Sequence, residues 1–321
     1  MDFELSDDQE ALGEGIASLC EGRFDIEAVR AMEDNGLDRG RWAELAETGV
    51  FVLCLPETDG GVGLGWAEAS VVFEQLGRSL VPGPLVATTL AAGRVDGAGD
   101  GSVVVASVER ADGPLNVEHV AWADVVVISD DDGLWQVPAA ELSGVDAAQP
   151  LDPLTPVRRI DGLPQGEQIG DPAAAADWRL RGTLLTAALQ LGLAAGATEL
   201  AVTYAKEREQ FGRPIGKFQA VKHRCADMIT RVEVLRAAVY AGGVTLDGRG
   251  VESAERTVSV AKILASKSAA ACGKDCVQVH GGMGYTWEVD AHLFLKRAWA
   301  LDLAFGDGDE LAEELAAGLV S

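Results

Sequence analysis

The sequence predicts an α+β fold in which a helical region, a small β region and a second helical region follow one another. Apolar residues recur every three or four positions towards both ends of the chain, which is the spacing of one buried helix face. Between these ends, short β-branched runs alternate with turns that contain Asp, Gly and Pro, which is typical of strands. We therefore expect three domains, residues 1–98, 99–175 and 176–321.

The N-terminal domain is expected to consist of helices joined by one glycine-rich loop. Ser6 and the acidic residues after it offer the chemistry of a helix N-cap, and that helix is expected to reach about Leu19. Further helices are predicted at 41–49 and 66–80. The loop between them contains Gly60, Gly61, Gly63 and Gly65.

The middle domain is expected to be a small barrel or sandwich. Its β-branched runs are Val103–Val105, Val117–Trp122, Val125–Ile128 and Leu134–Val137. After them, an acidic stretch rich in Pro and Ala, near 166–177, predicts a connector to the last domain.

The C-terminal domain, helical from Trp178 onward, is expected to be a four-helix bundle. Apolar residues between Phe218 and Val239 alternate in steps of three and four, which predicts one long amphipathic helix. The next helix, 257–280, is rich in Ala, Ser and Cys, whose small side chains let neighbouring helices approach closely. Long helices with short connections are typical of a bundle.

Composition narrows the function classes. The 321 residues are 48% hydrophobic, enough for more than one core, and the net charge of −25 disfavours a nucleic-acid partner. An anionic cofactor would need a local cationic pocket. The chain begins with acidic residues rather than a signal peptide, and apolar runs such as 184–193 are shorter than a bilayer span. We expect a cytoplasmic protein without a membrane span.

Five scattered cysteines predict no disulfide framework. Cys272, Cys276 and His280 share one face of a predicted helix, so a metal site is conceivable there. Two core thiols and a helix-end histidine explain the pattern more simply, because structural zinc needs four ligands from more than one local segment. No metal site is predicted.

Two segments of the C-terminal half stand out. Residues 208–219, between two predicted helices, read REQFGRPIGKFQ, and residues 278–285, at the end of the next helix, read QVHGGMGY. Together with the loop at 56–65 and the helix–β–helix order, they resemble the acyl-CoA dehydrogenase family. The resemblance covers both helical regions and is poor across the middle. It implies that the two segments hold the adenine, ribose and pyrophosphate end of FAD across a dimer interface.

The residue types suit this implied role. Arg208 offers a planar cation to phosphate or ribose oxygens, and Phe211 offers a flat face to adenine. The amides of Gln219 and Gln278 carry both donors and acceptors for ribose or adenine edges. At Gly281 and Gly282 the backbone can approach a ligand closely. Taken singly, these residues would be a surface charge, a core ring and a helix cap, and their joint spacing favours FAD.

The resemblance also exposes a missing group. Members of the family remove the α-proton of an acyl-CoA with a glutamate, while the β-hydride passes to the flavin. Counting along the chain, the matching positions are Phe305-Gly306 or, in other members, Gly182, and none is a carboxylate. The acids near the first position are expected to be helix-start and surface residues: Asp302, Asp307, Asp309 and Glu310. A shift in the alignment would make one of them the base, and no catalytic residue is assigned.

The middle region lacks the Thr/Ser-rich stretch and the tryptophan-bearing strand that surround the flavin ring in the family. Trp122 and Trp135 are better explained as core or edge residues of strands. The residues that surround the flavin ring in the family are therefore missing from this sequence. The residues that reach the FAD of a partner chain are present.

We therefore expect the non-catalytic subunit of a heteromeric acyl-CoA dehydrogenase, similar to short base-lacking subunits in actinobacterial members. Its partner would be a longer subunit that carries the catalytic glutamate, in a heterotetramer. The complex would dehydrogenate an acyl-CoA thioester from fatty acids or sterol side chains and pass electrons to an electron-transfer flavoprotein. The alternatives are a self-sufficient flavoenzyme that associates with itself, with Asp307 as base, and a scaffold without flavin.

Overall fold

The computed structural model describes residues 5–250 and 253–318, which form two compact units. The first unit combines the N-terminal stretch up to Ile26, Trp66–Val81 and the stretch from Thr183 onward. The second combines Glu27–Gly65 with Pro82–Gly182. Helices, then strands, then helices follow one another along the chain, which confirms the predicted α+β class. The expected domain boundaries after residues 98 and 175 remain predictions.

Two N-terminal helices belong to the first unit, α1 (Asp7–Arg23) and α4 (Trp66–Arg78). Ser6 caps α1 as predicted: the Gln9 amide donates to Ser6 Oγ and the Ser6 amide donates to Gln9 Oε1. The cap of α4 comes from far along the chain. The backbone amides of Trp66 and Ala67 donate to the carboxylate of Asp247, at 2.7 and 3.2 Å.

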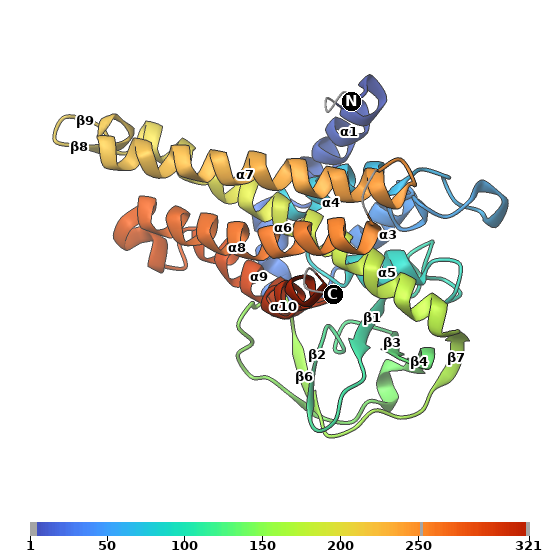
Figure 1. The fold of residues 1–321 in the computed structure, drawn as a ribbon. Coiled ribbons are helices and arrows are strands. Elements are labelled where there is room, and N and C mark those ends of the chain that lie inside the picture. Colours follow the sequence, from blue (N-terminus) through green and yellow to red (C-terminus); the bar gives the residue numbers. More distant parts are fainter. Residues whose placement is uncertain (1–4, 251–252, 319–321) are drawn as a thin grey trace. The chain divides into compact units, whose positions relative to one another are not determined.

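The remaining helices of the first unit are α6 (Pro172–Glu207, within this unit from Thr183), α7 (Gln219–Leu246), α8 (Ala254–His280), α9 (Ala291–Leu303) and α10 (Gly308–Gly318). The predicted helices at 218–239 and 257–280 are confirmed as α7 and α8, which pack side by side (Figure 1). Glycines let α4 and α6 touch backbone to backbone. A Cβ at Gly192 would lie 2.0 Å from Glu74 O, and one at Gly77 would lie 2.1 Å from Leu189 O.

Helix α6 is long and apolar enough to cross a membrane by length and composition. However, 83% of its most apolar 18-residue window is buried inside the protein. It is therefore a core helix.

The second unit contains α2 (Ile26–Asn35), α3 (Arg39–Glu47) and α5 (Leu85–Ala91). Helix α2 was not predicted. Helix α3 begins two residues before the predicted position, because the Asp38 carboxylate accepts from the amides of Gly40 and Arg41 and so caps it. The glycine-rich segment forms the predicted turn, with Gly60 and Gly63 at φ of 84° and 75°.

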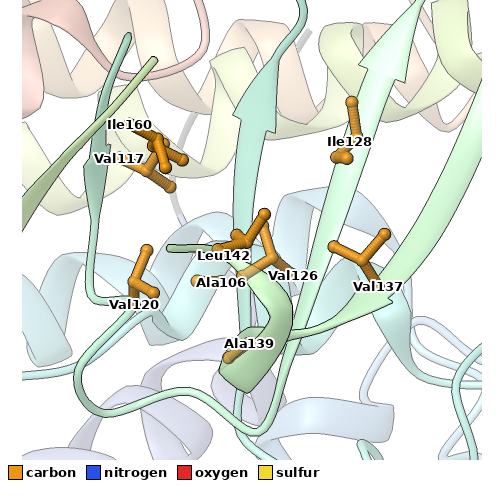
Figure 2. Close-up of a cluster of buried hydrophobic side chains, with 9 residues drawn as sticks. All are labelled: Ala106, Val117, Val120, Val126, Ile128, Val137, Ala139, Leu142 and Ile160. Carbon is orange, nitrogen blue, oxygen red and sulfur yellow. The ribbon is translucent and has the colours of Figure 1, made fainter. Parts of the chain in front are cut away.

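The strands form two small sheets. One has the order β1 (Val105–Glu109), β3 (Val125–Asp130), β4 (Gly133–Pro138), β7 (Glu167–Gly170), and the other has β2 (Leu115–Glu118), β6 (Val157–Ile160), β5 (Val145–Asp146). Only the β1–β3 pair, among these strands, is parallel. Side chains of both sheets, such as Val126 and Ile160, share one buried cluster (Figure 2). The arrangement is therefore closer to the predicted sandwich than to a barrel.

Two sequence predictions in this region are wrong. The stretch near 166–177 is not a connector, because it holds β7 and the start of α6. Pro172 occupies the first helical position, where it costs no hydrogen bond, and Asp171 Oδ1 accepts from the Ala174 amide. Trp122 lies in the turn after β2 rather than in a strand. Trp135 does lie in a strand, β4, and its Nε1 donates to Asp130.

Candidate functional site

All six residues predicted to contact a cofactor lie in the first unit, at the ends of two helices. Arg208 directly follows α6, Phe211 lies at the tip of the hairpin β8 (Glu209–Gln210)–β9 (Arg213–Pro214), and Gln219 begins α7. Gln278 lies in the last turn of α8, and Gly281 and Gly282 open the short helix η5 (Gly281–Tyr285). In Figure 1 the hairpin and the end of α8 lie at the same end of the bundle, at the left.

A ring stack joins the two segments. Tyr204, in the last turn of α6, stacks on His280, the last residue of α8, with ring centroids 4.2 Å apart and planes inclined by 26°. The carbonyl of Tyr204 accepts from the Arg208 amide at 2.8 Å, and His280 directly precedes Gly281. The fold therefore brings together the two motifs that the sequence singled out. Sequence reasoning missed the stack itself, although His280 lies within the second segment and Tyr204 lies one turn before Arg208.

The hairpin presents an aromatic ring at a conformational cost. Phe211 and Gly212 both have positive φ, 52° and 73°, as a two-residue type I′ turn requires. A bulky residue rarely adopts this region, and the ring of Phe211 is nevertheless 92% exposed. Its edge contact with Phe218, at 6.1 Å between centroids, leaves it open to further stacking. Packing within the described chain therefore does not explain why an aromatic residue occupies this strained and exposed position.

The surroundings of the hairpin are cationic in an acidic protein. Seven Lys and Arg but only three Asp and Glu occur between residues 206 and 231. Asp275 on α8 pairs with both Arg224 and Arg231 of α7. Arg208, Lys217 and Lys222 are exposed and make no ion pair with the residues that the structure describes. These free cations form the local positive field that an anionic ligand needs.

The three glycines of the second segment, Gly281, Gly282 and Gly284, differ in what requires a glycine at that position. Gly281 has φ +62° and ψ −135°, a backbone that other residues rarely adopt. A Cβ at Gly284 would lie 2.4 Å from Val277 O, so packing requires glycine there. A Cβ at Gly282 would meet nothing within 4 Å, and its φ is not positive. Nothing in the described chain requires glycine at 282, which leaves room for an external group to approach the backbone.

The expected location of the catalytic base lies between α9 and α10. Phe305 and Gly306 have positive φ, 54° and 109°, and Thr183 Oγ1 donates to Phe305 O at 2.7 Å. The fully buried Lys262 donates to the carbonyls of Leu301 and Asp302, at 2.6 and 3.0 Å. The segment that carries Phe305 is therefore anchored on α6 and α8.

The nearby acids serve mainly as helix-start residues, as the sequence predicted. Asp307 Oδ1 accepts from the amides of Asp309 and Glu310, at 2.7 and 3.3 Å, and so caps α10. Asp309 and Glu310 are exposed in the first turn of that helix. Asp302 differs, because it lies half-buried in the last turn of α9.

The cysteines near the site are core residues. Burial raises the pKa of Cys272 to about 11 and that of Cys276 to about 12, so both are thiols at neutral pH. The Nδ1 of His280 lies 2.8 Å from the carbonyl of Cys276. Among the described residues, no group of three or more His, Cys, Asp or Glu side chains is placed to hold a metal.

Comparison with known proteins identifies the family. The family model for the acyl-CoA dehydrogenase N-terminal domain matches residues 6–101, and that for the C-terminal domain matches residues 180–320. The chain is 36% identical to the acyl-CoA dehydrogenase IpdE2 of Mycolicibacterium smegmatis over 312 residues, which cover 92% of this chain and 93% of IpdE2. The chain therefore belongs to the acyl-CoA dehydrogenase family, whose members typically bind FAD.

Two solved structures have the same fold. A chain of the ChsE4–ChsE5 complex from Mycobacterium tuberculosis has a TM-score of 0.86 at 22% identity and covers 100% of this chain and 99% of its own length. A variant of the Tcur3481–Tcur3483 steroid ACAD has a TM-score of 0.82 at 25% identity, with 98% of this chain and 99% of its own covered. The predicted α+β acyl-CoA dehydrogenase fold is thereby confirmed.

Proposed function

We propose that this chain is the subunit of a heteromeric acyl-CoA dehydrogenase that completes the FAD pocket of a partner and supplies no catalytic base. The observation that carries the proposal is that the two segments that hold the six predicted contact residues lie at one end of the bundle. Phe211, in the first of them, is 92% exposed. A side chain that reaches across to a ligand held by another chain is expected to be exposed in its own chain. The paired steroid ACAD Tcur3481–Tcur3483 supports an assembly of two unlike chains and a steroid substrate, and the relative IpdE2 supports acyl-CoA dehydrogenation.

The residues at this end fit the dinucleotide half of FAD. Arg208 would pair with the pyrophosphate, Phe211 would lie against the adenine, and Gln219 and Gln278 would bond ribose or adenine edges. The open backbone at Gly282 would let the ligand come close. FAD, when bound, supplies the acceptor for the β-hydride as the Cα–Cβ bond of the thioester becomes double.

The α-proton must then go to a carboxylate of the partner. In this chain the positions that match the family's base are Phe305-Gly306 and Gly182. Asp307, which would be the base if the chain were a self-sufficient flavoenzyme, instead caps α10. These observations support a partner subunit that carries the glutamate. The substrate would be an acyl-CoA, with sterol-derived chains favoured by the steroid ACAD relative, and the acceptor an electron-transfer flavoprotein.

The decisive experiment counts FAD per subunit. The chain is purified alone and together with a longer acyl-CoA dehydrogenase subunit that keeps the glutamate, and both samples are gel-filtered. We expect a colourless lone chain and a yellow complex with one FAD for each pair of unlike chains. A lone chain that is yellow and active would instead establish the self-sufficient flavoenzyme. A complex that keeps full flavin content after all the motif residues here are replaced would establish a scaffold.

A further inference from the structure

His280 is a buried histidine with one ring nitrogen still available. Its side chain closes α8, and the residue is 5% exposed. Nδ1 lies 2.8 Å from the carbonyl oxygen of Cys276, one turn earlier. A carbonyl oxygen only accepts, so Nδ1 carries the hydrogen, and Nε2 of the neutral ring is an acceptor. No residue in the described part of the chain donates to Nε2.

The ring is held in one orientation. Tyr204 stacks on one face with centroids 4.2 Å apart, and the bond to Cys276 O fixes which edge of the ring faces the helix backbone. Nε2 therefore points away from the carbonyl that Nδ1 binds. An acceptor that is fixed in this way costs little further conformational entropy on binding a donor.

The position of this acceptor is the junction of the two cofactor segments. Tyr204 is tied to Arg208 through a backbone hydrogen bond of 2.8 Å, and His280 is bonded to Gly281. The free cations at this end, Arg208, Lys217 and Lys222, can only donate. The adenosine part of a dinucleotide has donors of its own, the ribose hydroxyls and the adenine amine, and these need acceptors.

We propose that Nε2 of His280 accepts a hydrogen bond from an O–H or N–H of the adenosine part of FAD, with Tyr204 as the residue that positions the ring. The inference rests on the proposed function, because it takes the bundle end as a dinucleotide surface. It adds to that surface one residue that was not among the six predicted cofactor contacts and gives a role to the ring stack.

The test uses the assembled complex, stripped of flavin and titrated with FAD while flavin fluorescence is followed. His280→Phe keeps a flat ring for Tyr204 but removes the acceptor. We expect its Kd for FAD to rise about three- to tenfold, the loss of one neutral hydrogen bond. Tyr204→Phe keeps the stack and should bind FAD within about twofold of the wild type, whereas Tyr204→Leu should weaken FAD binding as His280→Phe does.

FMN, which has the flavin but no adenosine, is the matched probe. His280→Phe should leave the Kd for FMN unchanged, while loss of the bond from Nδ1 to Cys276 O lowers the melting temperature of the flavin-free complex only modestly. Equal weakening of FMN and FAD, or wild-type FAD binding by His280→Phe in a complex that Arg208→Ala weakens, would overturn the inference and leave the proposed function standing. If Arg208→Ala also binds FAD like the wild type, the proposed function fails with it.

Discussion

Tyr204 and His280 stack with their ring centroids 4.2 Å apart, and this contact ties the end of α6 to the end of α8. The residues proposed to contact the cofactor lie close to each ring: Arg208 is one helical turn after Tyr204, and Gly281-Gly282 directly follow His280. The proposed dinucleotide surface thus consists of two helix ends that are held together by their last turns. Substitutions at this surface can be tested separately for their effect on FAD binding and for their effect on the stability of the chain.

Arg208→Ala should lower the FAD content of the complex after gel filtration. The lost contact is a charge-assisted bond to a phosphate, which contributes about 1.5–3 kcal/mol and so about ten- to a hundredfold in Kd. Arg256→Ala is the matched control, because Arg256 is exposed near the opposite end of α8, roughly 36 Å from His280 by the rise of the helix. Equal flavin content in the two variants would remove Arg208 from the site.

Gly282→Ala and Gly284→Ala should have opposite consequences. A methyl group at 282 meets nothing within 4 Å, so the lone chain should melt at the wild-type temperature while the complex retains less FAD. A methyl group at 284 would lie 2.4 Å from Val277 O, so that variant should destabilise the lone chain itself. Differential scanning fluorimetry of the chain and flavin absorbance of the complex distinguish the two. Unchanged FAD retention by Gly282→Ala would mean that no ligand approaches there.

Removing the acids near Phe305 should leave turnover within a few-fold of the wild type. The variants are Asp302→Asn, Asp307→Asn, Asp309→Asn and Glu310→Gln, each assayed in the assembled complex. A general base contributes ~10²–10⁴-fold to the rate, so its loss would be unmistakable. Asp307→Asn keeps a good N-cap, whereas Asp307→Ala should destabilise α10 by about 1 kcal/mol. A collapse of turnover in one variant with FAD still bound would assign the base to this chain.

Lys262→Met should lower the free energy of unfolding of the lone chain by about 1–3 kcal/mol. The substitution keeps a long unbranched side chain but leaves the carbonyls of Leu301 and Asp302 without their buried donor. Lys267→Met is the control, since Lys267 is exposed on the same helix and should change stability by less than about 0.5 kcal/mol. Urea denaturation followed by circular dichroism measures both. Equal midpoints would show that Lys262 does not anchor the segment.

Stability should also depend on pH through Asp130 in the β region. Burial acts to raise the pKa of Asp130, but hydrogen bonds from Trp135 and Arg110 outweigh it and hold the pKa below the ordinary 3.8. Its contribution is therefore present above pH 3.8 and is lost as the pH falls through the lower, folded-state pKa. Asp130→Asn should be destabilised at pH 7, and its difference from the wild type should shrink towards pH 3. Asp112→Asn, at an exposed bend, is the control for removing one surface charge from the same region.

Features that depend on neighbouring residues or on a repeated spacing could be predicted from the sequence. The periodic helices α7 and α8, the Ser6 cap and the position of the segments 208–219 and 278–285 at helix ends could be predicted because each depends on neighbours in the chain. The start of α6 was missed because a stretch rich in Pro and Ala has the composition of a linker, although Asp171 at the cap, Pro172 in the first helical position and the alanines after it are the sequence signals of a helix start.

Within the candidate site, the tertiary contacts could not be predicted from the sequence. The Tyr204–His280 stack depends on how α6 and α8 pack, which no local spacing records. A lysine such as Lys262 would be placed on a solvated face by composition, yet it is fully buried because two carbonyls at the end of α9 accept from it. The adjacency of Thr183 and Phe305 is of the same kind.

The cap of α4 has a consequence for how the protein is made. The first amides of α4 are bound by Asp247, 181 residues further along the chain. At a ribosomal rate of about 5–20 residues per second, α4 waits roughly 10–35 s for that carboxylate to be synthesised. The helices α6 and α7, which contact α4 in the finished protein, are themselves completed only in the later part of this time. Nascent chains halted before residue 247 should therefore be substrates for chaperones, whereas chains that have emerged beyond it can close the first unit.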